Sequence, residues 1–236
     1  GEEIKEFRPS GALEIRKAGL EFEKMRERIL RHLNQRSEML SGISHDLRTP
    51  LTRIKLQLTM IKDNTLSKKL SDDVDEMEKM LNEYLQFASS GSKEKTETFD
   101  LSELVENIIN KYENTNILKY FKKRIYFNGR RNLIQRCINN LINNSIRYGE
   151  KTKVIIEKIK SNIVITIEDD GPGIPKSEYK NVTKPFYKID KSRSESKSSV
   201  GLGLAISSDI TKSHGGDINF SKSNLGGLKV MVSLPV

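Results

Sequence analysis

Residues 44–51 read Ser-His-Asp-Leu-Arg-Thr-Pro-Leu and place a histidine directly before a carboxylate. A neutral imidazole nitrogen can attack phosphorus, and the adjacent Asp46 can take or orient the proton on the other nitrogen of His45. Thr49 follows one helical turn later, on the same helix face as His45. The octapeptide therefore predicts a phosphoryl acceptor at His45.

The helix around His45 carries an apolar residue at every seventh position, which is typical of a coiled coil or helical bundle. These residues are Leu33, Leu40, Leu47, Ile54 and Ile61. His45 lies two residues from Leu47, about 200° around a helix that turns ~100° per residue. We therefore expect His45 to project away from the apolar seam, where a second domain can reach it.

A second group of polar residues, Asn139–Asn144, lies in a segment with helical spacing. Asn140 and Asn144 share one face of that helix, and amide oxygens suit Mg²⁺, which also binds substrate phosphates. Arg147 follows Asn143 by one turn and can meet a phosphate. These residues predict a magnesium and phosphate site, whereas a solvated polar face remains the structural alternative.

Two glycine-rich segments follow. Asp169-Asp170-Gly171-Pro172-Gly173 comes directly after a predicted strand, where a carboxylate can accept from an exocyclic amine such as that of adenine. Residues 201–204, Gly-Leu-Gly-Leu, open a helix whose N–H groups can bind phosphate. The intervening loop, residues 174–200, is rich in lysine and long enough to form a lid.

The composition narrows the class of protein. The chain has 236 residues, a formal charge of +9 and a single cysteine, so an internal disulfide framework is excluded and Cys137 is expected to be buried filler. No run of eighteen apolar residues is present, so nothing in the chain is predicted to span a membrane. The basic residues are scattered among acidic ones, which argues against a nucleic-acid partner.

The periodicity divides the chain into a helical part and a mixed part. A helix is expected over 12–62, a turn at 63–65, a second helix with an apolar stripe over 70–88, and a polar linker over 89–97. Beyond the linker, the expected helices are 101–114, 132–148 and 202–213, and the expected strands are 124–128, 152–159, 162–169, 217–222 and 228–234. The mixture predicts an α/β sandwich.

The order of these motifs resembles that of a bacterial sensor histidine kinase, with residues 45–53 most similar to the EnvZ type. The resemblance implies an α+β chain in which a dimeric four-helix bundle, one helical hairpin per chain, precedes an ATP-binding α/β sandwich of the histidine kinase, gyrase and chaperone type. The implied domains are a HAMP-like signalling helix (1–35), a dimerisation and phosphotransfer hairpin (36–92) and a catalytic domain (93–236).

The same resemblance implies a role for particular residues. His45, Asp46 and Thr49 would be catalytic, with Thr49 serving dephosphorylation of the partner, and Asn144 would hold Mg²⁺. The ATP-binding residues would be Asn140, Asn144, Arg147, Tyr148, Asp169, Gly171, Gly173, Phe186, Lys188, Gly201, Leu202 and Gly203. The implied reaction is autophosphorylation of His45 by ATP, followed by transfer to an aspartate of a response regulator. The chain would be the cytoplasmic part of an inner-membrane protein, with its transmembrane segments upstream.

Two other functions fit part of the pattern. An ATPase of the gyrase and chaperone class carries a hydrolytic base in the asparagine helix, but this chain has Asn139 and Asn143 where a carboxylate would be expected. A degenerate dimeric scaffold would lack phosphotransfer. Its support is Ser199, which stands where the family's second glycine box usually has glycine.

Overall fold

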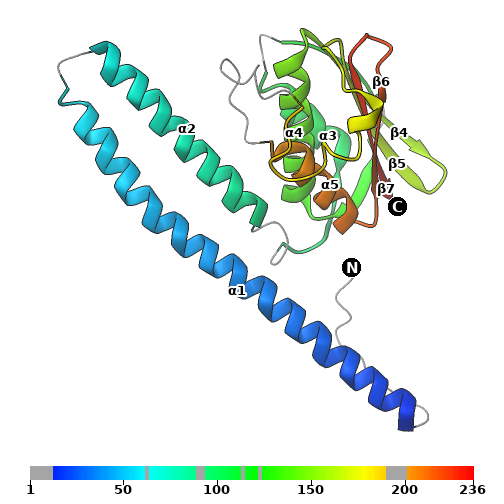
Figure 1. Cartoon of the computed structure of the whole chain (residues 1–236). Helices are drawn as coiled ribbons and strands as arrows, with labels where there is room; N and C mark the ends of the chain where they lie inside the picture. The colour runs from blue at the N-terminus through cyan, green and yellow to red at the C-terminus, as the bar shows by residue number, and fades with distance from the viewer. Residues whose placement is uncertain (1–12, 62–63, 89–93, 113–114, 122–123, 190–200) are drawn as a thin grey trace. The chain divides into compact units, whose positions relative to one another are not determined.

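A computed structural model describes residues 13–61, 64–88, 94–112, 115–121, 124–189 and 201–236. The chain divides into two compact units, residues 1–92 and 93–236 (Figure 1). Within the described residues, no helix is both long and apolar enough to cross a membrane. The proposed boundary at residue 35 stays a prediction.

The first unit is a hairpin of two helices, α1 (Leu13–Leu58) and α2 (Asn64–Ala88). Its small core is formed by Leu51, Leu58 and Val74, against which Leu81 packs. The turn predicted over 63–65 is wrong for its last two residues, because α2 already begins at Asn64. The Ser67 hydroxyl donates to the Leu58 carbonyl at 2.7 Å and so satisfies one of the carbonyls left at the end of α1.

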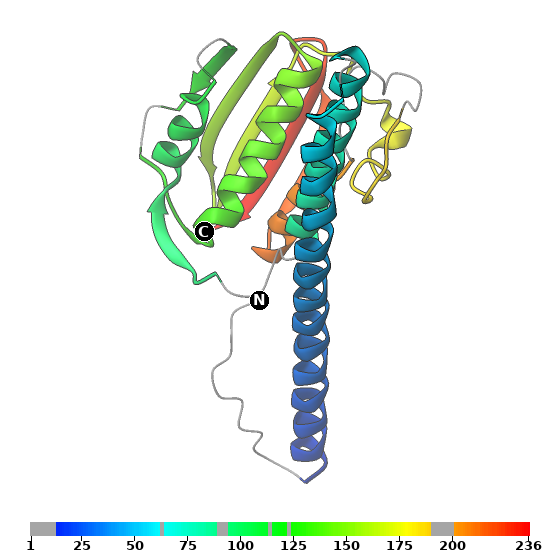
Figure 2. The same cartoon turned by 90° about the vertical axis from the view of Figure 1, so that its left-hand side faces the viewer.

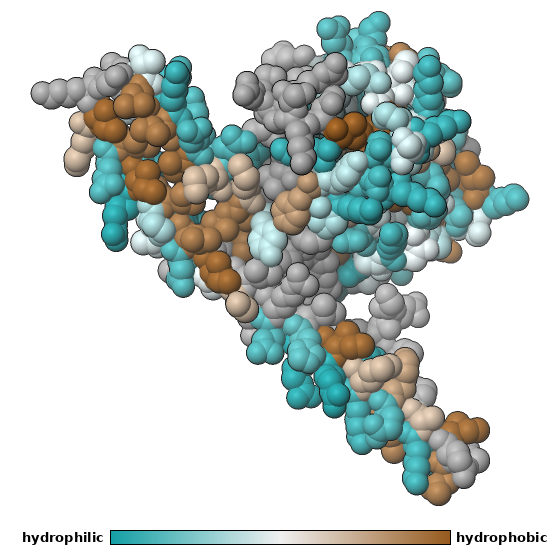
Figure 3. All heavy atoms as spheres, in the orientation of Figure 1, coloured by the Kyte–Doolittle hydropathy of each residue, from teal (hydrophilic) through white to brown (hydrophobic). Residues whose placement is uncertain are grey.

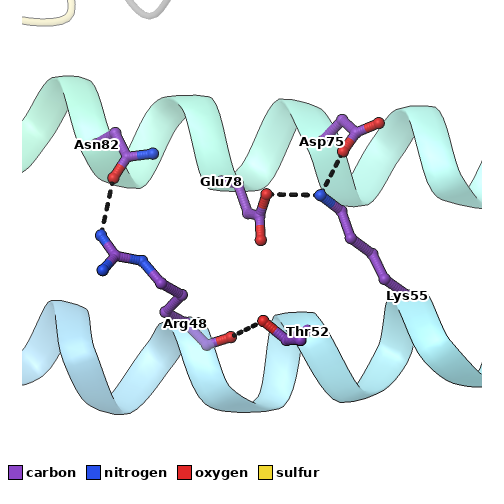
Figure 4. Close-up of polar contacts among 6 residues, drawn as sticks. All are labelled: Arg48, Thr52, Lys55, Asp75, Glu78 and Asn82. Atoms are coloured by element: carbon purple, nitrogen blue, oxygen red, sulfur yellow. Dashed lines mark hydrogen bonds and ion pairs between the residues drawn. The ribbon is translucent and has the colours of Figure 1, made fainter.

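Polar contacts set the register of the two helices (Figure 4). The Lys55 ammonium lies 2.6 Å from carboxylate oxygens of both Asp75 and Glu78, and Arg48 donates to the Asn82 side chain at 3.2 Å. These contacts bring each α1 side chain to a particular turn of α2. The hairpin is therefore aligned by charge as well as by its apolar core.

The hairpin does not bury Leu47 and Ile54, two of the apolar residues that recur at every seventh position. Leu47 and Ile54 keep 46% and 41% of their surface exposed, whereas Leu51 and Leu58, each four residues further on, are buried. Leu70 and Met77 of α2 are also exposed. Figure 3 shows apolar side chains gathered along the hairpin near the end where its helices join. Among its described residues, a single hairpin therefore leaves these apolar side chains exposed.

The second unit is built on a five-stranded sheet with the order β2-β4-β5-β7-β6. Its strands are β2 (Asn116–Tyr120), β4 (Lys151–Ile159), β5 (Asn162–Asp169), β6 (Asp217–Lys222) and β7 (Leu228–Pro235). All neighbours are antiparallel except β2 and β4. The predicted hairpin over 152–169 is confirmed, with Ile159 paired to Asn162 at its turn.

Helices α4 (Arg131–Tyr148) and α5 (Gly203–Ser213) cover one face of this sheet (Figures 1 and 2). Ile163, Ile165 and Ile167 alternate along β5 and are buried, as are Ile138 and Leu141 of α4. The sheet and the two helices thus form the layered core that the alternating pattern predicted.

A shorter helix and a small second sheet complete this unit. Helix α3 (Leu101–Ile109) begins where the Asp100 carboxylate accepts from the N–H groups of Ser102 and Glu103. It ends earlier than the predicted residue 114, before β2 begins at Asn116. Strands β1 (Glu97–Asp100) and β3 (Tyr126–Gly129) pair antiparallel, and a short 3₁₀ helix, η1, spans Lys176–Glu178.

Candidate active site

Asp169 lies at the end of β5, where its side chain is buried. Its Oδ1 accepts hydrogen bonds from the N–H groups of Gly171 and Leu228, both at 3.0 Å. Burial raises the pKa of Asp169 above its ordinary value, while these two donors act in the opposite direction. Because both bonds fall on Oδ1, Oδ2 is the oxygen with capacity to accept from a ligand amine.

Glycines let the backbone close around this carboxylate. A Cβ at Gly227 would lie 2.1 Å from Asp169 Oδ1, and a Cβ at Gly171 would lie 2.6 Å from the Tyr148 carbonyl oxygen. Gly173 has φ +70°, a conformation that other residues adopt only with strain. Three segments distant in sequence therefore meet at Asp169.

The asparagine face of α4 lies against the start of α5. Asn140 and Asn144 are half-buried, and the Asn140 amide donates to the Gly203 carbonyl at 3.5 Å. The first turn of α5 has no side-chain cap at Leu202, so its N–H groups are suited to an anion. Leu202 itself is fully buried.

The last turn of α4 carries a positive charge, that of Arg147, one turn after Asn144. Arg147 is half-buried, with its guanidinium 5.8 Å from the centre of the exposed Tyr148 ring. Asn144, Arg147 and Tyr148 thus lie on two successive turns of one helix. In the same helix, Tyr148 packs against Gly171 in the segment that follows Asp169, and Asn140 contacts Gly203 at the start of α5.

Phe186 and Tyr187 of the predicted lid lie against Gly201, the residue that follows the lid. The Phe186 N–H donates to the Gly201 carbonyl at 3.0 Å, and a Cβ at Gly201, which has φ +75°, would lie 2.9 Å from the Tyr187 carbonyl. Phe186 also has a positive φ and is exposed, as is Lys188. Residues 190–200 of the predicted lid, Ser199 included, lie outside the described residues.

A short polar network stiffens the segment before Phe186. The Tyr187 hydroxyl donates to Glu178 at 2.5 Å, and Asn181 donates to the same carboxylate at 3.0 Å. These donors lower the pKa of Glu178, and the carboxylate raises the pKa of Tyr187. Residues 174–189, expected to be irregular, therefore include η1 and a fixed set of side-chain contacts.

The phosphoacceptor candidates lie in α1 of the other unit. His45 is within the helix, but its side chain is outside the described residues, so its outward direction stays a prediction. Asp46 and Thr49 are exposed. Cys137 is buried as predicted, with its pKa raised by burial to about 11, which makes it an inert thiol.

Three contacts that involve α4 or the segment after Asp169 could not be expected from motif order. Glu94 accepts from the N–H groups of Asn132 and Leu133 at 2.5 and 3.2 Å and so caps α4, whose own Ncap residue makes no side-chain cap. Tyr112 donates to Asn143 at 2.6 Å. Asp170 accepts from backbone N–H groups that lead into β4. For Gly227, the sequence signal is that it belongs to a pair of glycines, Gly226-Gly227, directly before the strand predicted over 228–234.

The fold and this site define the ATP-binding domain of the histidine kinase, gyrase B and HSP90 type. Residues 129–236 match the family model described as histidine kinase-, DNA gyrase B- and HSP90-like ATPase, and residues 35–93 match the His Kinase A phospho-acceptor domain. Together the two matches cover more than half of the chain. The chain belongs to the bacterial sensor histidine kinases.

Relatives of known sequence agree along nearly the whole chain. Sensor histidine kinase GtrS of Pseudomonas aeruginosa is 33% identical over 95% of this chain and 47% of its own length. Sensor histidine kinase CpxA of Escherichia coli is 28% identical over 96% of this chain and 53% of its own length. The chain therefore spans about half the length of the curated relatives it matches.

Solved structures share the fold. Full-length ShkA in complex with AMPPNP has a TM-score of 0.68 at 18% identity, over 85% of this chain and 46% of that one. The Acinetobacter baumannii histidine kinase AdeS has a TM-score of 0.57 at 24% identity, over 81% of this chain and 97% of that one. The helical hairpin followed by an α/β domain is thus the arrangement expected for this family.

Proposed function

We propose that the chain binds ATP and Mg²⁺ in its second unit and transfers the γ-phosphoryl group to His45. The observation that carries this proposal is the convergence of Asp169, the asparagine face of α4 and the uncapped start of α5, in a chain that also matches a phospho-acceptor domain. Asp169 Oδ2 accepts from the adenine amine, while Arg147 and the first turn of α5 hold phosphate.

The residues present suit a magnesium ion. Asn144 offers an amide oxygen on the half-buried face of α4, and Mg²⁺ takes its other ligands from phosphate and water. When bound, the ion neutralises charge that develops on the phosphates. Among the described residues no group of three or more His, Cys, Asp or Glu gathers as a metal site.

The transfer step needs an uncharged nitrogen on His45. That nitrogen attacks the γ-phosphorus, the bond from this phosphorus to the bridging oxygen breaks, and ADP leaves. Asp46 takes or orients the proton on the other ring nitrogen. The phosphoryl group then passes to an aspartate of a response regulator. Thr49 positions water for the reverse task, the dephosphorylation of that regulator.

A second copy of the chain fits the exposed apolar face of the hairpin. Leu47 and Ile54 of α1 and Leu70 and Met77 of α2 are exposed in one chain, and two hairpins would bury them in a four-helix bundle. On another face of α1, after Thr49, Leu56 is 62% exposed, and Met60 in the turn that follows the helix is 82% exposed. We assign that face to the regulator.

The whole protein would be longer than this chain. Its relatives are about twice as long and are named sensors. We propose that this chain is the cytoplasmic part of a membrane sensor.

Nucleotide titration of two variants tests the proposed site. Asn144→Ala removes a magnesium ligand and Asp169→Ala removes the adenine acceptor, so each should lower affinity for Mg-ATP by at least tenfold, about 1.4 kcal/mol. Neither residue belongs to the hairpin, so sedimentation should show an unchanged dimer. Unchanged affinity in Asp169→Ala would remove that residue from the site, and release of free phosphate without labelled protein would favour a simple ATPase.

A further inference from the structure

The two carboxylates at the end of β5, Asp169 and Asp170, lie in opposite environments. Asp169 is buried, and its pKa is raised by that burial. The Asp170 Oδ1 accepts from the N–H groups of Glu150 and Lys151, at 2.8 and 2.9 Å, and these donors lower the pKa of Asp170. The second carboxylate is therefore held by backbone, about twenty residues away in sequence.

Glu150 and Lys151 form the exit from α4 into β4. The Gly149 N–H donates to the Ser145 carbonyl and closes the last turn of α4, and Lys151 is the first residue of β4. A Cβ at Gly149 would lie 2.6 Å from Asp170 Oδ1. The glycine thus lets the Asp170 carboxylate reach the end of the helix.

A second close contact joins the same two segments. A Cβ at Gly171 would lie 2.6 Å from the Tyr148 carbonyl oxygen, so residues 170–171 pack directly on residues 148–151. Asp169 stands on one side of this junction. Tyr148, Arg147 and, one turn earlier, Asn144 stand on the other.

We propose that Asp170 is a positioning residue that fixes the C-terminal end of α4 relative to Asp169. The proposal rests on the proposed function, in which Asp169 reads adenine and Asn144 and Arg147 serve the phosphates and metal. One bound ATP must reach both groups, so their separation has to match the length of the nucleotide. Asp170 acts through two backbone bonds and is not assigned any contact with ATP.

The chemistry predicts which substitutions matter. The two N–H groups need an acceptor oxygen, which an asparagine side chain also provides. Asp170→Asn should therefore keep affinity for Mg-AMPPNP within about threefold of the unmodified chain. Asp170→Ala leaves both donors without this partner and should weaken Mg-AMPPNP at least tenfold, while adenosine, which does not reach α4 through phosphates, should lose less.

Asp100 provides a matched control in the same unit. Its carboxylate also accepts from two backbone N–H groups, those of Ser102 and Glu103, but it caps α3. Asp100→Ala should lower the thermal midpoint of the full chain as Asp170→Ala does, without changing affinity for Mg-AMPPNP. Comparison of the two alanine variants separates positioning from general loss of stability.

Calorimetric titration of the full chain and these three variants with Mg-AMPPNP and with adenosine decides the question. Equal affinity of Asp170→Ala and Asp100→Ala for Mg-AMPPNP would overturn the positioning role and leave the proposed function intact. Loss in Asp170→Asn as large as in Asp170→Ala would overturn the acceptor argument. Failure of the unmodified chain to bind Mg-AMPPNP would overturn the proposed function and this inference together.

Discussion

Asp169 depends on two backbone N–H groups from separate segments, that of Gly171 beside it and that of Leu228 at the start of β7. Gly227 must lack a side chain, because a Cβ there would lie 2.1 Å from Asp169 Oδ1. Gly227→Ala should push the carboxylate out of place and weaken Mg-ATP by at least tenfold, about 1.4 kcal/mol. Nucleotide titration measures this loss.

The neighbouring Gly226 is the control for that substitution. It has φ +115° but nothing within 4 Å of an added Cβ. Gly226→Ala should therefore strain the turn by about 1–2 kcal/mol and lower stability, with nucleotide affinity nearly unchanged. If both variants bound Mg-ATP equally well, the support that Gly227 gives to Asp169 would be refuted.

His214 makes the second unit sensitive to acid. Its Nδ1–H donates to the Ile210 carbonyl at 2.8 Å, and its Nε2 accepts from the Arg130 N–H at 3.1 Å, which requires the neutral ring. Burial lowers its pKa, and the charge of Arg130 lowers it further. The unfolded chain therefore takes up a proton first as pH falls, so stability decreases below the ordinary histidine pKa of about 6.5.

Urea unfolding between about pH 5 and about pH 8 tests this pH dependence. The variant His214→Asn keeps a donor and an acceptor but cannot titrate. The difference in unfolding free energy between the unmodified chain and the variant should shrink as pH falls through about 6.5. A difference that stays constant over this range would show that His214 does not titrate with folding.

At the residue scale, motif order predicted Asp169, Asn140 and Gly201 as one group. In the structure, α4 contacts both the start of α5 and the segment that follows Asp169. Motif order did not predict Glu94, which caps α4 from 38 residues away, or the separate role of Asp170. Both carboxylates bind backbone N–H groups. Every residue but proline carries that donor, so no residue type marks the partner.

At the scale of elements, two neighbouring leucines of α1 have different expected roles: Leu58 stabilises the hairpin and Leu56 contacts the regulator. Leu58 is buried against Val74, so Leu58→Ala should destabilise the hairpin by about 2–3 kcal/mol. Leu56 is exposed, so Leu56→Ala should leave the free energy of unfolding unchanged. The same variant should slow phosphoryl transfer from His45 to the regulator. Thermal unfolding and transfer kinetics measure the two effects. Equal destabilisation by both variants would contradict this assignment of faces.

Long periodic elements were predictable and short exposed ones were not. The helical spacing of 132–148 and the alternation over 152–169 correspond to α4, β4 and β5, because one face of each is buried in the core. Strands β1 and β2 were missed. β2 lies at the edge of the sheet and is largely exposed, so it carries no alternating pattern. The stripe through Leu47, which is typical of a helical bundle, is a face that a single hairpin leaves exposed.

At the scale of the whole molecule, that exposed stripe predicts a dimer. Ile54 is 41% exposed in one chain and would lie inside a four-helix bundle. Ile54→Glu would bury a charge without a partner and should convert the dimer to monomers in sedimentation velocity, whereas Leu56→Glu, on the other face, should not. A monomeric unmodified chain, or an Ile54→Glu variant that remains dimeric, would exclude this interface.

The account requires phosphate from ATP to reach one particular histidine. The most direct measurement is incorporation of label from γ-labelled ATP into the full chain and into His45→Gln, followed by acid and base treatment. We predict label that is lost in acid, survives base, and is absent from His45→Gln. Label retained in His45→Gln, or labelled free phosphate with no labelled protein, would contradict the assignment of this chain as a histidine kinase that acts through His45.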